Sequence, residues 1–221
     1  MWRQKIKRFF LSSENQYNAG KSFKTEQKLD LYFTEDFADI LETWGESHVW
    51  NEIQMFLANC NGIVLDIACG TGITMQKLEK NKRIEVWGFD ISDLLINRAI
   101  NKGIDHDRLK VMDATKTSYP DLFFDYSYSI GSLEHFSESG ICDFIKETKR
   151  YTKKASFHQI PVSKSKKDEG WITTTQSYFN NSENWWLIKF KESYSEVLVI
   201  NSGWSDTQSD GKWFVCMNIE N

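Results

Sequence analysis

The sequence has little proline, and its few cysteines follow no disulfide or metal-binding spacing. Only two of its 221 residues are proline, Pro120 and Pro161, and no low-complexity linker or internal repeat occurs. The four cysteines form no CxxC pair, the spacing of many zinc sites and redox motifs. These absences exclude a cysteine zinc site and a disulfide framework. They argue against a second independent domain and predict reduced thiols in a cytoplasmic protein.

Long apolar runs and an excess of positive charge are also missing. No apolar stretch reaches the roughly 18 residues that a membrane-spanning helix needs. The formal net charge of -4 gives no overall basic field for nucleic acid or an anionic membrane. The basic stretch MWRQKIKRFFL has too short an apolar patch for a signal peptide. We expect it to form a solvated amphipathic helix, with weak membrane-surface contact as the alternative.

Residues 1–60 have a helical pattern, and we expect them to form an N-terminal helical cap. Apolar residues recur every three or four positions from Leu29 to Trp44, which predicts a helix there. Ser47 is placed to cap a second helix, which the pair Asn61-Gly62 would end.

From residue 61 the pattern changes to short strands that alternate with helices. We expect strands within GIVLDIA, IEVWGFD, RLKVMDA, FFDYSYSIGS and ASFHQIP, and helices capped by Ser92 and Ser182. Two last strands, SEVLVI and KWFVCMNI, flank the polar loop NSGWSDTQSDG. Residues 61–221 therefore predict an α/β domain with a Rossmann-like, doubly wound, seven-stranded sheet. We expect the sheet to be mostly parallel with a C-terminal antiparallel hairpin.

The stretch VLDIACGTG, residues 64–72, joins the first predicted strand to a helix through a glycine turn. Such a turn usually cradles a nucleotide cofactor. The dinucleotide fingerprint requires a third glycine, where this sequence has Ile73, and an anionic pyrophosphate is not favoured beside Asp66. A cofactor with a cationic ammonium and sulfonium would tolerate that acid. An NAD-dependent oxidoreductase is therefore a distant alternative.

The segment from Asp66 to Gly72 resembles the first motif of class I S-adenosylmethionine-dependent methyltransferases, with Ala68 in place of the first glycine. The resemblance covers residues 63 to about 160 and implies S-adenosylmethionine as the cofactor and S-adenosylhomocysteine as its product. Asp90 ends the second strand, where a carboxylate can accept both ribose hydroxyls or cap a helix. By similarity, Asp113 accepts a hydrogen bond from the adenine amino group, unless it is a plain loop acid. The expected cofactor-binding residues are Asp66, Ala68, Gly70, Gly72, Asp90, Ile91, Met112, Asp113, Ala114, Ile130, Gly131 and Ser132.

Two histidines near strand ends are candidates for a general base. Glu134-His135 resembles the LEH signature of many small-molecule methyltransferases, and His135 would either accept a proton from the substrate or line the cofactor. His158 is the second candidate, with a hydrogen-bonded core role as the alternative. Some sugar methyltransferases that this chain resembles use Mg²⁺, but no ligand spacing here argues for a metal, and we expect none.

Residues 161–186 follow the fifth strand, where class I methyltransferases often place a substrate cover. The segment is polar and carries aromatic residues, a composition that suits sugars and other polar small molecules. It also resembles, more loosely, small methyltransferases encoded with bacterial surface-polysaccharide enzymes. The substrate-binding candidates are Trp44, Glu134, Trp171 and Tyr178. Lys164, Lys166 and Lys167 would contact a phosphate on the substrate or form a solvated run.

These features together predict methyl transfer to a polar small molecule, with O-methylation of a sugar, sugar nucleotide or phosphorylated surface-glycan precursor first. One alternative is N- or C-methylation of another metabolite, such as an amine or quinone precursor. Another is a cofactor-binding partner protein without catalysis. Nucleic acid is disfavoured because the (Asp/Asn)-Pro-Pro-aromatic motif of base methylation and a basic patch with interleaved aromatics are both absent.

Overall fold

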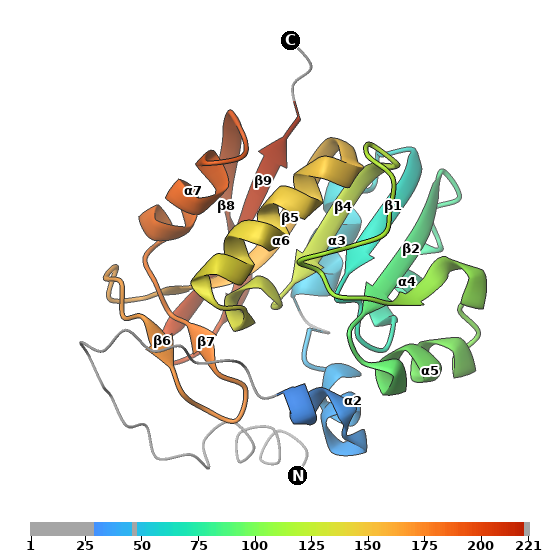
Figure 1. Ribbon diagram of the computed structural model, residues 1–221, viewed down its shortest axis with the longest axis horizontal. Coiled ribbons are helices and arrows are strands. Elements are labelled where there is room, and N and C mark those ends of the chain that lie inside the picture. The colour runs from blue at the N-terminus through green and yellow to red at the C-terminus, as the bar shows by residue number, and fades with distance from the viewer. Residues whose placement is uncertain (1–28, 46–47, 219–221) are drawn as a thin grey trace.

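A seven-stranded sheet forms the centre of the molecule in the computed structural model, which describes residues 29–45 and 48–218 (Figure 1). The strand order is β3-β2-β1-β4-β5-β9-β8. The strands are β1 (Gly62–Ile67), β2 (Ile84–Asp90), β3 (Leu109–Val111), β4 (Phe124–Ile130), β5 (Thr152–Ser163), β8 (Glu196–Ser205) and β9 (Ser209–Met217). Strands β1 to β5 are parallel, and β9 is antiparallel to both of its neighbours. The predicted fold class is confirmed.

Helices cover both faces of the sheet, so its central strands are buried on both sides. The α-helices are α2 (Glu35–Leu41), α3 (Val49–Phe56), α4 (Ile73–Leu78), α5 (Asp93–Asn101), α6 (Glu138–Tyr151) and α7 (Glu183–Lys191). One core lies under α6 and α7, and a second joins α3, α4 and α5 to the other face. Figure 1 shows α6 and α7 in front of the sheet and α3 behind it. This double burial explains why β1 is a continuous apolar run.

Polar side chains begin the helices where the sequence predicts it. The Ser92 hydroxyl accepts a hydrogen bond from the N–H of Leu95, and the Ser182 hydroxyl accepts one from Trp185. Each bond satisfies one of the free N–H groups at a helix start. Both predicted caps are confirmed. The predicted cap at Ser47 and the predicted helix in MWRQKIKRFFL lie outside the described residues.

The predicted single helix between Leu29 and Trp44 is wrong, because the chain is interrupted at Thr34. A 3-10 helix η1 (Leu29–Phe33) precedes it, and α2 follows it. Thr34 has extended backbone angles, and its hydroxyl accepts from the N–H of Phe37 as the cap of α2. A threonine that can cap a helix in this way competes with helix continuation, although the apolar spacing runs on.

The predicted polar loop NSGWSDTQSDG is also wrong in its extent. Strand β8 continues to Ser205 and β9 begins at Ser209. The Asp206 carboxylate closes the short turn by accepting from the N–H groups of Gln208, at 2.8 Å, and Ser209, at 2.6 Å. An edge strand with one exposed face tolerates polar residues, so composition alone suggested a loop. The fifth strand is likewise longer than predicted, because β5 runs on through both ends of ASFHQIP.

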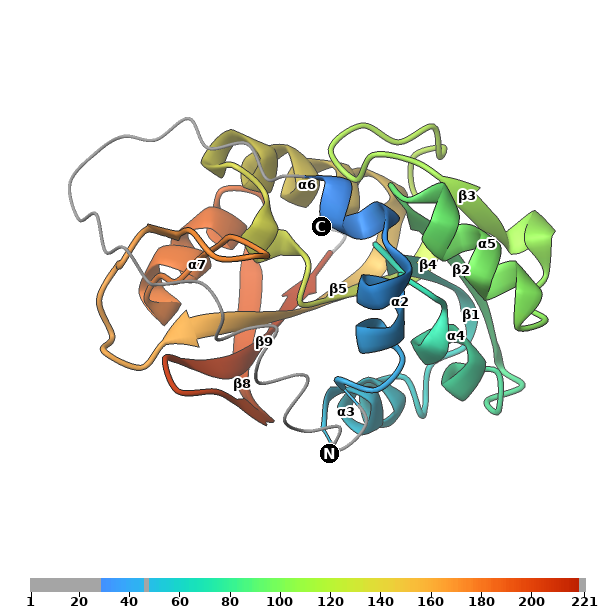
Figure 2. The same ribbon diagram turned by 90° about the horizontal axis from the view of Figure 1, so that it is seen from below.

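Two segments lie along the edge of the sheet where the parallel strands end, at the bottom of Figure 1. One is η1 with α2. The other is a small antiparallel hairpin of β6 (Trp171–Ile172) and β7 (Tyr178–Phe179), which the sequence did not predict. Figure 2 views the molecule from this side and shows both segments facing the reader. In the part of the chain that the structure describes, no helix has the length and apolarity to cross a membrane.

Candidate active site

The turn after β1 depends on glycines with left-handed backbone angles. Gly70 has a φ of +55° and Gly72 a φ of +75°, values that L-residues rarely adopt. A Cβ atom on Gly72 would lie 2.2 Å from Cδ1 of Ile104 and 3.2 Å from Cβ of Ala99. Gly72 therefore lets the turn pack closely against the segment around α5. This close approach is what a third glycine provides in dinucleotide-binding turns.

Ala68 occupies a glycine-like position in the same turn. Its φ is +56°, which is unusual for a residue with a Cβ. The replacement of the motif's first glycine by alanine therefore keeps the glycine geometry at a cost in backbone strain.

Asp66 lies at the end of β1 and is buried. Its Oδ2 accepts a hydrogen bond of 2.5 Å from the hydroxyl of Thr74, on the helix that follows the turn. Burial, with a smaller contribution from the nearby Asp90 carboxylate, raises the pKa of Asp66 to about 7, against the effect of the Thr74 hydroxyl. In this arrangement Asp66 ties the two sides of the glycine turn together. Thr74 was not predicted from the sequence as the partner of Asp66.

Asp90 lies at the end of β2, beside the same turn. One carboxylate oxygen accepts from the N–H of Gly70 at 2.9 Å, and the other accepts from the N–H of Ser92 at 3.0 Å. Burial raises the pKa of Asp90, while these backbone hydrogen bonds oppose the rise. Each oxygen has a second lone pair. Asp90 can therefore orient the glycine turn and still accept from a pair of ribose hydroxyls.

The other predicted adenosine contacts follow β2 and β3. Ile91 and Met112 are half-buried, and Ala114 is buried. The N–H of Met112 donates to the carbonyl of Asp90, which brings the ends of β2 and β3 together. Asp113 is exposed, and its Oδ1 accepts from both the N–H and the hydroxyl of Thr115 at 2.8 Å. Its second oxygen has no such contact within the described chain.

The N-terminal segment covers the glycine positions of the site. A Cβ on Gly70 would lie 3.2 Å from Cδ1 of Leu41, and one on Gly131 would lie 3.3 Å from Cη2 of Trp44. The structure thus brings the predicted Trp44 to the end of β4. The Ser92 hydroxyl donates to the carbonyl of Tyr32 in η1 at 2.5 Å. Leu41 and Tyr32 were not predictable as site residues, because helical spacing gives no information about which sheet edge a helix covers.

Strand β4 ends at a turn that includes the predicted Ile130, Gly131 and Ser132. Gly131 has a φ of +58°, and the Ser132 hydroxyl donates back to the carbonyl of Ile130 at 3.1 Å. A short 3-10 helix, η3 (Leu133–His135), follows directly. The chain therefore places Glu134 and His135 one turn beyond the segment expected under the methionine part of the cofactor.

Glu134 is a buried carboxylic acid without a hydrogen-bond partner for one of its oxygens. Its side chain is 5% exposed, and Oε2 has no partner among the described residues. The other oxygen, Oε1, lies 3.6 Å from the position of a Cβ on Gly131. Burial raises the pKa of Glu134 to about 8, so the carboxyl is largely protonated at neutral pH. A buried polar atom left unpaired is costly, which points to a partner that arrives with a ligand.

His135 is held in one orientation by the hairpin. Its Nδ1 lies 2.8 Å from the carbonyl oxygen of Ser177, so Nδ1 carries the proton and donates it to that oxygen. Nε2 then carries the lone pair, 3.7 Å from Oε1 of Glu134. Burial lowers the pKa of His135 to about 4, although the backbone contacts with Ser177 and Gly131 oppose this. The ring is therefore neutral at pH 7 and can accept a proton at Nε2.

His158 has the core role that the sequence analysis held as its alternative. It is fully buried, with Nδ1 2.8 Å from the Ser129 hydroxyl and Nε2 3.1 Å from the Ser156 hydroxyl. Its ring stacks on Phe190 at 5.2 Å, and burial lowers its pKa to about 3. Both nitrogens are occupied and no face is open. This environment favours the core role for His158.

The hairpin β6–β7 forms a second cover over the end of β4. Tyr178 is half-buried and donates to Oε1 of Gln208 at 3.3 Å, and Trp171 packs edge-on against Phe179 at 5.0 Å. The two covers also touch, because Nε2 of Gln176 donates to the Tyr32 hydroxyl at 3.0 Å. The hairpin thus brings Tyr178 and His135 to the same end of the sheet as Trp44.

The predicted phosphate contacts lie on exposed residues beyond β5. Lys164 pairs with Asp210 at 3.6 Å, and Lys166 and Lys167 are exposed. Lys164 and Lys166 line a cavity of about 370 Å³ with Lys212, which pairs with Glu183 at 3.1 Å. Two of these three lysines are therefore balanced by acids.

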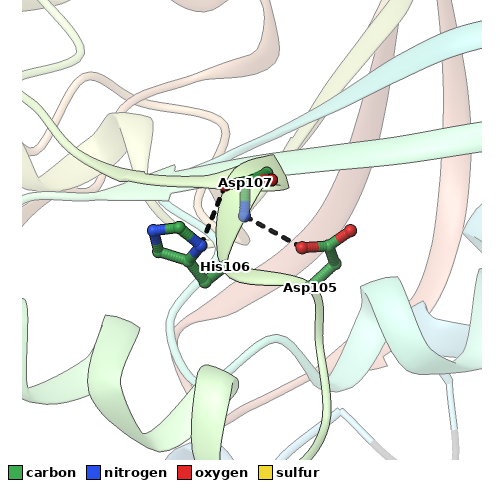
Figure 3. Close-up of side chains that lie close together, drawn as sticks. All are labelled: Asp105, His106 and Asp107. Carbon is green, nitrogen blue, oxygen red and sulfur yellow. Dashed lines mark hydrogen bonds and ion pairs between the residues drawn. The ribbon is translucent and has the colours of Figure 1, made fainter.

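One group of potential metal ligands occurs among the described residues, and it lies on the surface (Figure 3). Nδ1 of His106 is 2.9 Å from a carboxylate oxygen of Asp107, and the N–H of Asp107 donates to Asp105 at 3.0 Å. Asp105 caps the 3-10 helix η2 (His106–Arg108) through that bond. Local turn capping accounts for the arrangement.

Comparison with known proteins agrees with the geometry of the glycine turn and strand ends. Residues 64–155 match a family model described as a methyltransferase domain. A search of curated protein sequences gave no match. The match begins at β1 and ends within β5, so it contains every residue that the sequence analysis assigned to the cofactor.

Solved structures resemble the whole sheet. The PH0226 protein of Pyrococcus horikoshii OT3 has 20% identity and a TM-score of 0.61, with 84% of this chain and 93% of that chain covered. A SAM-dependent methyltransferase of Aquifex aeolicus has 18% identity and a TM-score of 0.59, with 83% and 99% covered. A phosphoethanolamine N-methyltransferase of Haemonchus contortus has 14% identity and a TM-score of 0.65, with 83% and 57% covered.

The fold is therefore that of the Rossmann-like methyltransferases. The domain match and this fold together support a SAM-dependent methyltransferase, with S-adenosylmethionine as the cofactor. The site residues fit this cofactor. Asp90 keeps free acceptor capacity beside the glycine turn, and Glu134 has an unpaired oxygen at the end of β4.

Proposed function

We propose that this protein transfers a methyl group from S-adenosylmethionine to a hydroxyl group of a polar small molecule, with His135 as the general base. The observation that carries the proposal is the fixed orientation of His135. Its Nδ1–H is bound by the carbonyl of Ser177, which leaves a lone pair on Nε2 beside Glu134. A neutral histidine with one nitrogen anchored and the other free is the usual arrangement of a general base.

The bound cofactor supplies an electrophilic methyl group on a sulfonium. The protein's own residues then orient the acceptor, exclude water and hold the proton that the acceptor loses. His135 takes that proton at Nε2, which lies 3.7 Å from Oε1 of Glu134. Trp44 and the β6–β7 hairpin exclude water from the end of β4.

The composition of the hairpin supports a sugar, sugar nucleotide or phosphorylated surface-glycan precursor as the acceptor. Trp171 and Tyr178 are half-buried and present aromatic surface together with polar tips. The lysine-lined cavity beyond β5 offers cations for a phosphate group. The similar Haemonchus contortus enzyme is described in complex with phosphomonomethylethanolamine, a phosphorylated small molecule.

A second candidate is methylation of a nitrogen or carbon atom in another metabolite. The lowered pKa of His135, about 4, makes it a weak base for a sugar hydroxyl. An uncharged amine needs no strong base. The solved structures that resemble this chain include the Haemonchus contortus N-methyltransferase and a geranyl diphosphate C-methyltransferase of Streptomyces coelicolor. A third candidate, a cofactor-binding partner without catalysis, predicts cofactor binding with no turnover on any acceptor.

The first experiment is calorimetric titration with S-adenosylmethionine, S-adenosylhomocysteine and NAD, on the wild type and Asp90→Ala. We expect both sulfur compounds to bind the wild type, NAD not to bind, and Asp90→Ala to lose binding. A methyl-transfer screen with sugar nucleotides and phosphorylated metabolites then follows. No binding of either sulfur compound would overturn the proposal, and NAD binding would favour an oxidoreductase.

Three variants test the base once an acceptor is found. His135→Asn keeps a donor near the Ser177 carbonyl but lacks Nε2, His135→Ala lacks both, and His106→Ala changes an exposed histidine as the control. We expect both His135 variants to lose about 10²–10⁴-fold in turnover with unchanged cofactor affinity. Full turnover in His135→Asn would exclude the base role and favour an amine or carbon acceptor.

A further inference from the structure

Glu134 is a buried acid that the transfer step alone does not explain. Its Oε2 lacks a hydrogen-bond partner among the described residues, and its side chain is only 5% exposed. Its Oε1 lies 3.6 Å from where a Cβ on Gly131 would be, and the edge of the Trp44 ring lies 3.3 Å from that same point. The carboxyl group is therefore aimed at the segment expected under the methionine part of the cofactor.

The groups around Glu134 do not neutralise its charge. The titratable groups that face it in the described chain are His135, on its own 3-10 helix, and Tyr178, on β7. Burial lowers the pKa of His135 to about 4 and raises the pKa of Tyr178 to about 12, so both are neutral at pH 7. An ionised Glu134 would be a buried charge without a counter-charge, which is unfavourable in the empty site.

We propose that Glu134 is the counter-charge to the sulfonium of S-adenosylmethionine: it holds a proton in the empty site and releases it to solvent when the cationic cofactor binds. The inference rests on the proposed function, because it requires that cofactor. The product S-adenosylhomocysteine has a neutral thioether in place of the sulfonium. It therefore leaves Glu134 protonated, and the site distinguishes cofactor from product by one charge.

The size of the effect follows from the charges. A positive charge close to a carboxyl group lowers its pKa by about 1–3. Since burial raises the pKa of Glu134 to about 8 in the free protein, the carboxyl is mostly protonated near neutral pH and mostly ionised beside the sulfonium. At about pH 7.5 the binding of S-adenosylmethionine is expected to release about 0.7 proton, and that of S-adenosylhomocysteine close to none.

The test is calorimetric titration of both compounds in phosphate and in Tris buffer at the same pH. The difference between the heats in the two buffers, divided by the difference between the ionisation enthalpies of the buffers, gives the number of protons released. We expect the wild type to release more protons with S-adenosylmethionine than with S-adenosylhomocysteine. Glu134→Gln should abolish this difference. As a consequence, wild-type affinity for S-adenosylmethionine should rise several-fold between about pH 6 and pH 8, while that for the product stays flat.

Asp66→Asn is the rival variant, because burial also raises the pKa of Asp66, to about 7. If this variant, and not Glu134→Gln, abolishes the difference, the proposal is overturned. Equal proton release with both compounds in the wild type overturns it too. Failure of both compounds to bind would instead overturn the proposed function itself. Should Glu134→Gln not fold, carbon-13 spectra of glutamate-labelled wild type supply the readout: one carboxyl must ionise with S-adenosylmethionine and not with the product.

Discussion

Gly72→Ala has a direct consequence for the packing of the glycine turn. At a φ of +75° an alanine is strained, and its Cβ would lie 2.2 Å from Cδ1 of the buried Ile104. Positive-φ strain costs roughly 1–2 kcal/mol and overpacking of a filled core about 1–3 kcal/mol. We therefore expect the free energy of unfolding to fall by about 2–5 kcal/mol. Urea titration followed by tryptophan fluorescence measures this value.

Two further variants separate strain from overpacking. Gly103→Ala has a φ of +93° with nothing within 4 Å of its Cβ, so it should cost only the strain, roughly 1–2 kcal/mol. Ile104→Val removes the clashing Cδ1. The double variant Gly72→Ala/Ile104→Val should therefore be more stable than the sum of the single changes by about 1 kcal/mol or more. The reasoning is refuted if Gly72→Ala costs no more than Gly103→Ala and the double variant is additive.

Three other changes have expected outcomes. Ala68→Gly relieves the strain of a φ of +56° but gives the unfolded chain more conformational freedom. Urea titration should therefore find a free energy of unfolding that is unchanged or raised by less than about 1 kcal/mol. A clear loss of stability would contradict the strain at Ala68. Burial raises the pKa of Glu134 from 4.5 to about 8, so between these pH values the folded protein keeps a proton that the unfolded chain loses. The free energy of unfolding should therefore fall as the pH rises between these values. Urea titrations should find that Glu134→Gln makes this pH dependence weaker. His158→Ala leaves a cavity and two unpaired serine hydroxyls, and should lower the free energy of unfolding by about 2–4 kcal/mol without changing calorimetric cofactor affinity; lost affinity with normal stability would restore a functional role.

The sheet was predictable because its signals are local. Buried parallel strands are continuous apolar runs, and Ser92 and Ser182 stand where helix starts need an acceptor. The interruption at Thr34 was not predictable from apolar spacing, since spacing does not register a side chain that competes for the backbone. The hairpin β6–β7 was missed because strands of two residues give no periodic pattern.

The site was predictable only where motif spacing and strand ends coincide. Asp90, Gly70 and Gly131 follow strands that end at one edge, so the fold itself gathers them. The partners that set the properties of the site are distant in sequence. Ser177, which fixes His135, is 42 residues away, and Gln176 and Tyr32 are separated by 144 residues. Nor could the sequence separate His135 from His158, because it does not show that hydroxyl groups lie at both nitrogens of His158, whereas the Ser177 carbonyl orients His135 through Nδ1.

In helix α3, Glu52 forms hydrogen bonds to both of the last two strands. Its carboxylate accepts hydrogen bonds from the Ser202 hydroxyl, the N–H of Gly203 and Nε1 of Trp213, across up to 161 residues of sequence. These contacts close one of the longest loops in the chain, and such long-range contacts slow folding. During synthesis the Glu52 carboxylate of α3 therefore stays without these partners until β8 and β9 have left the ribosome. The nascent protein should depend most on chaperones in that interval.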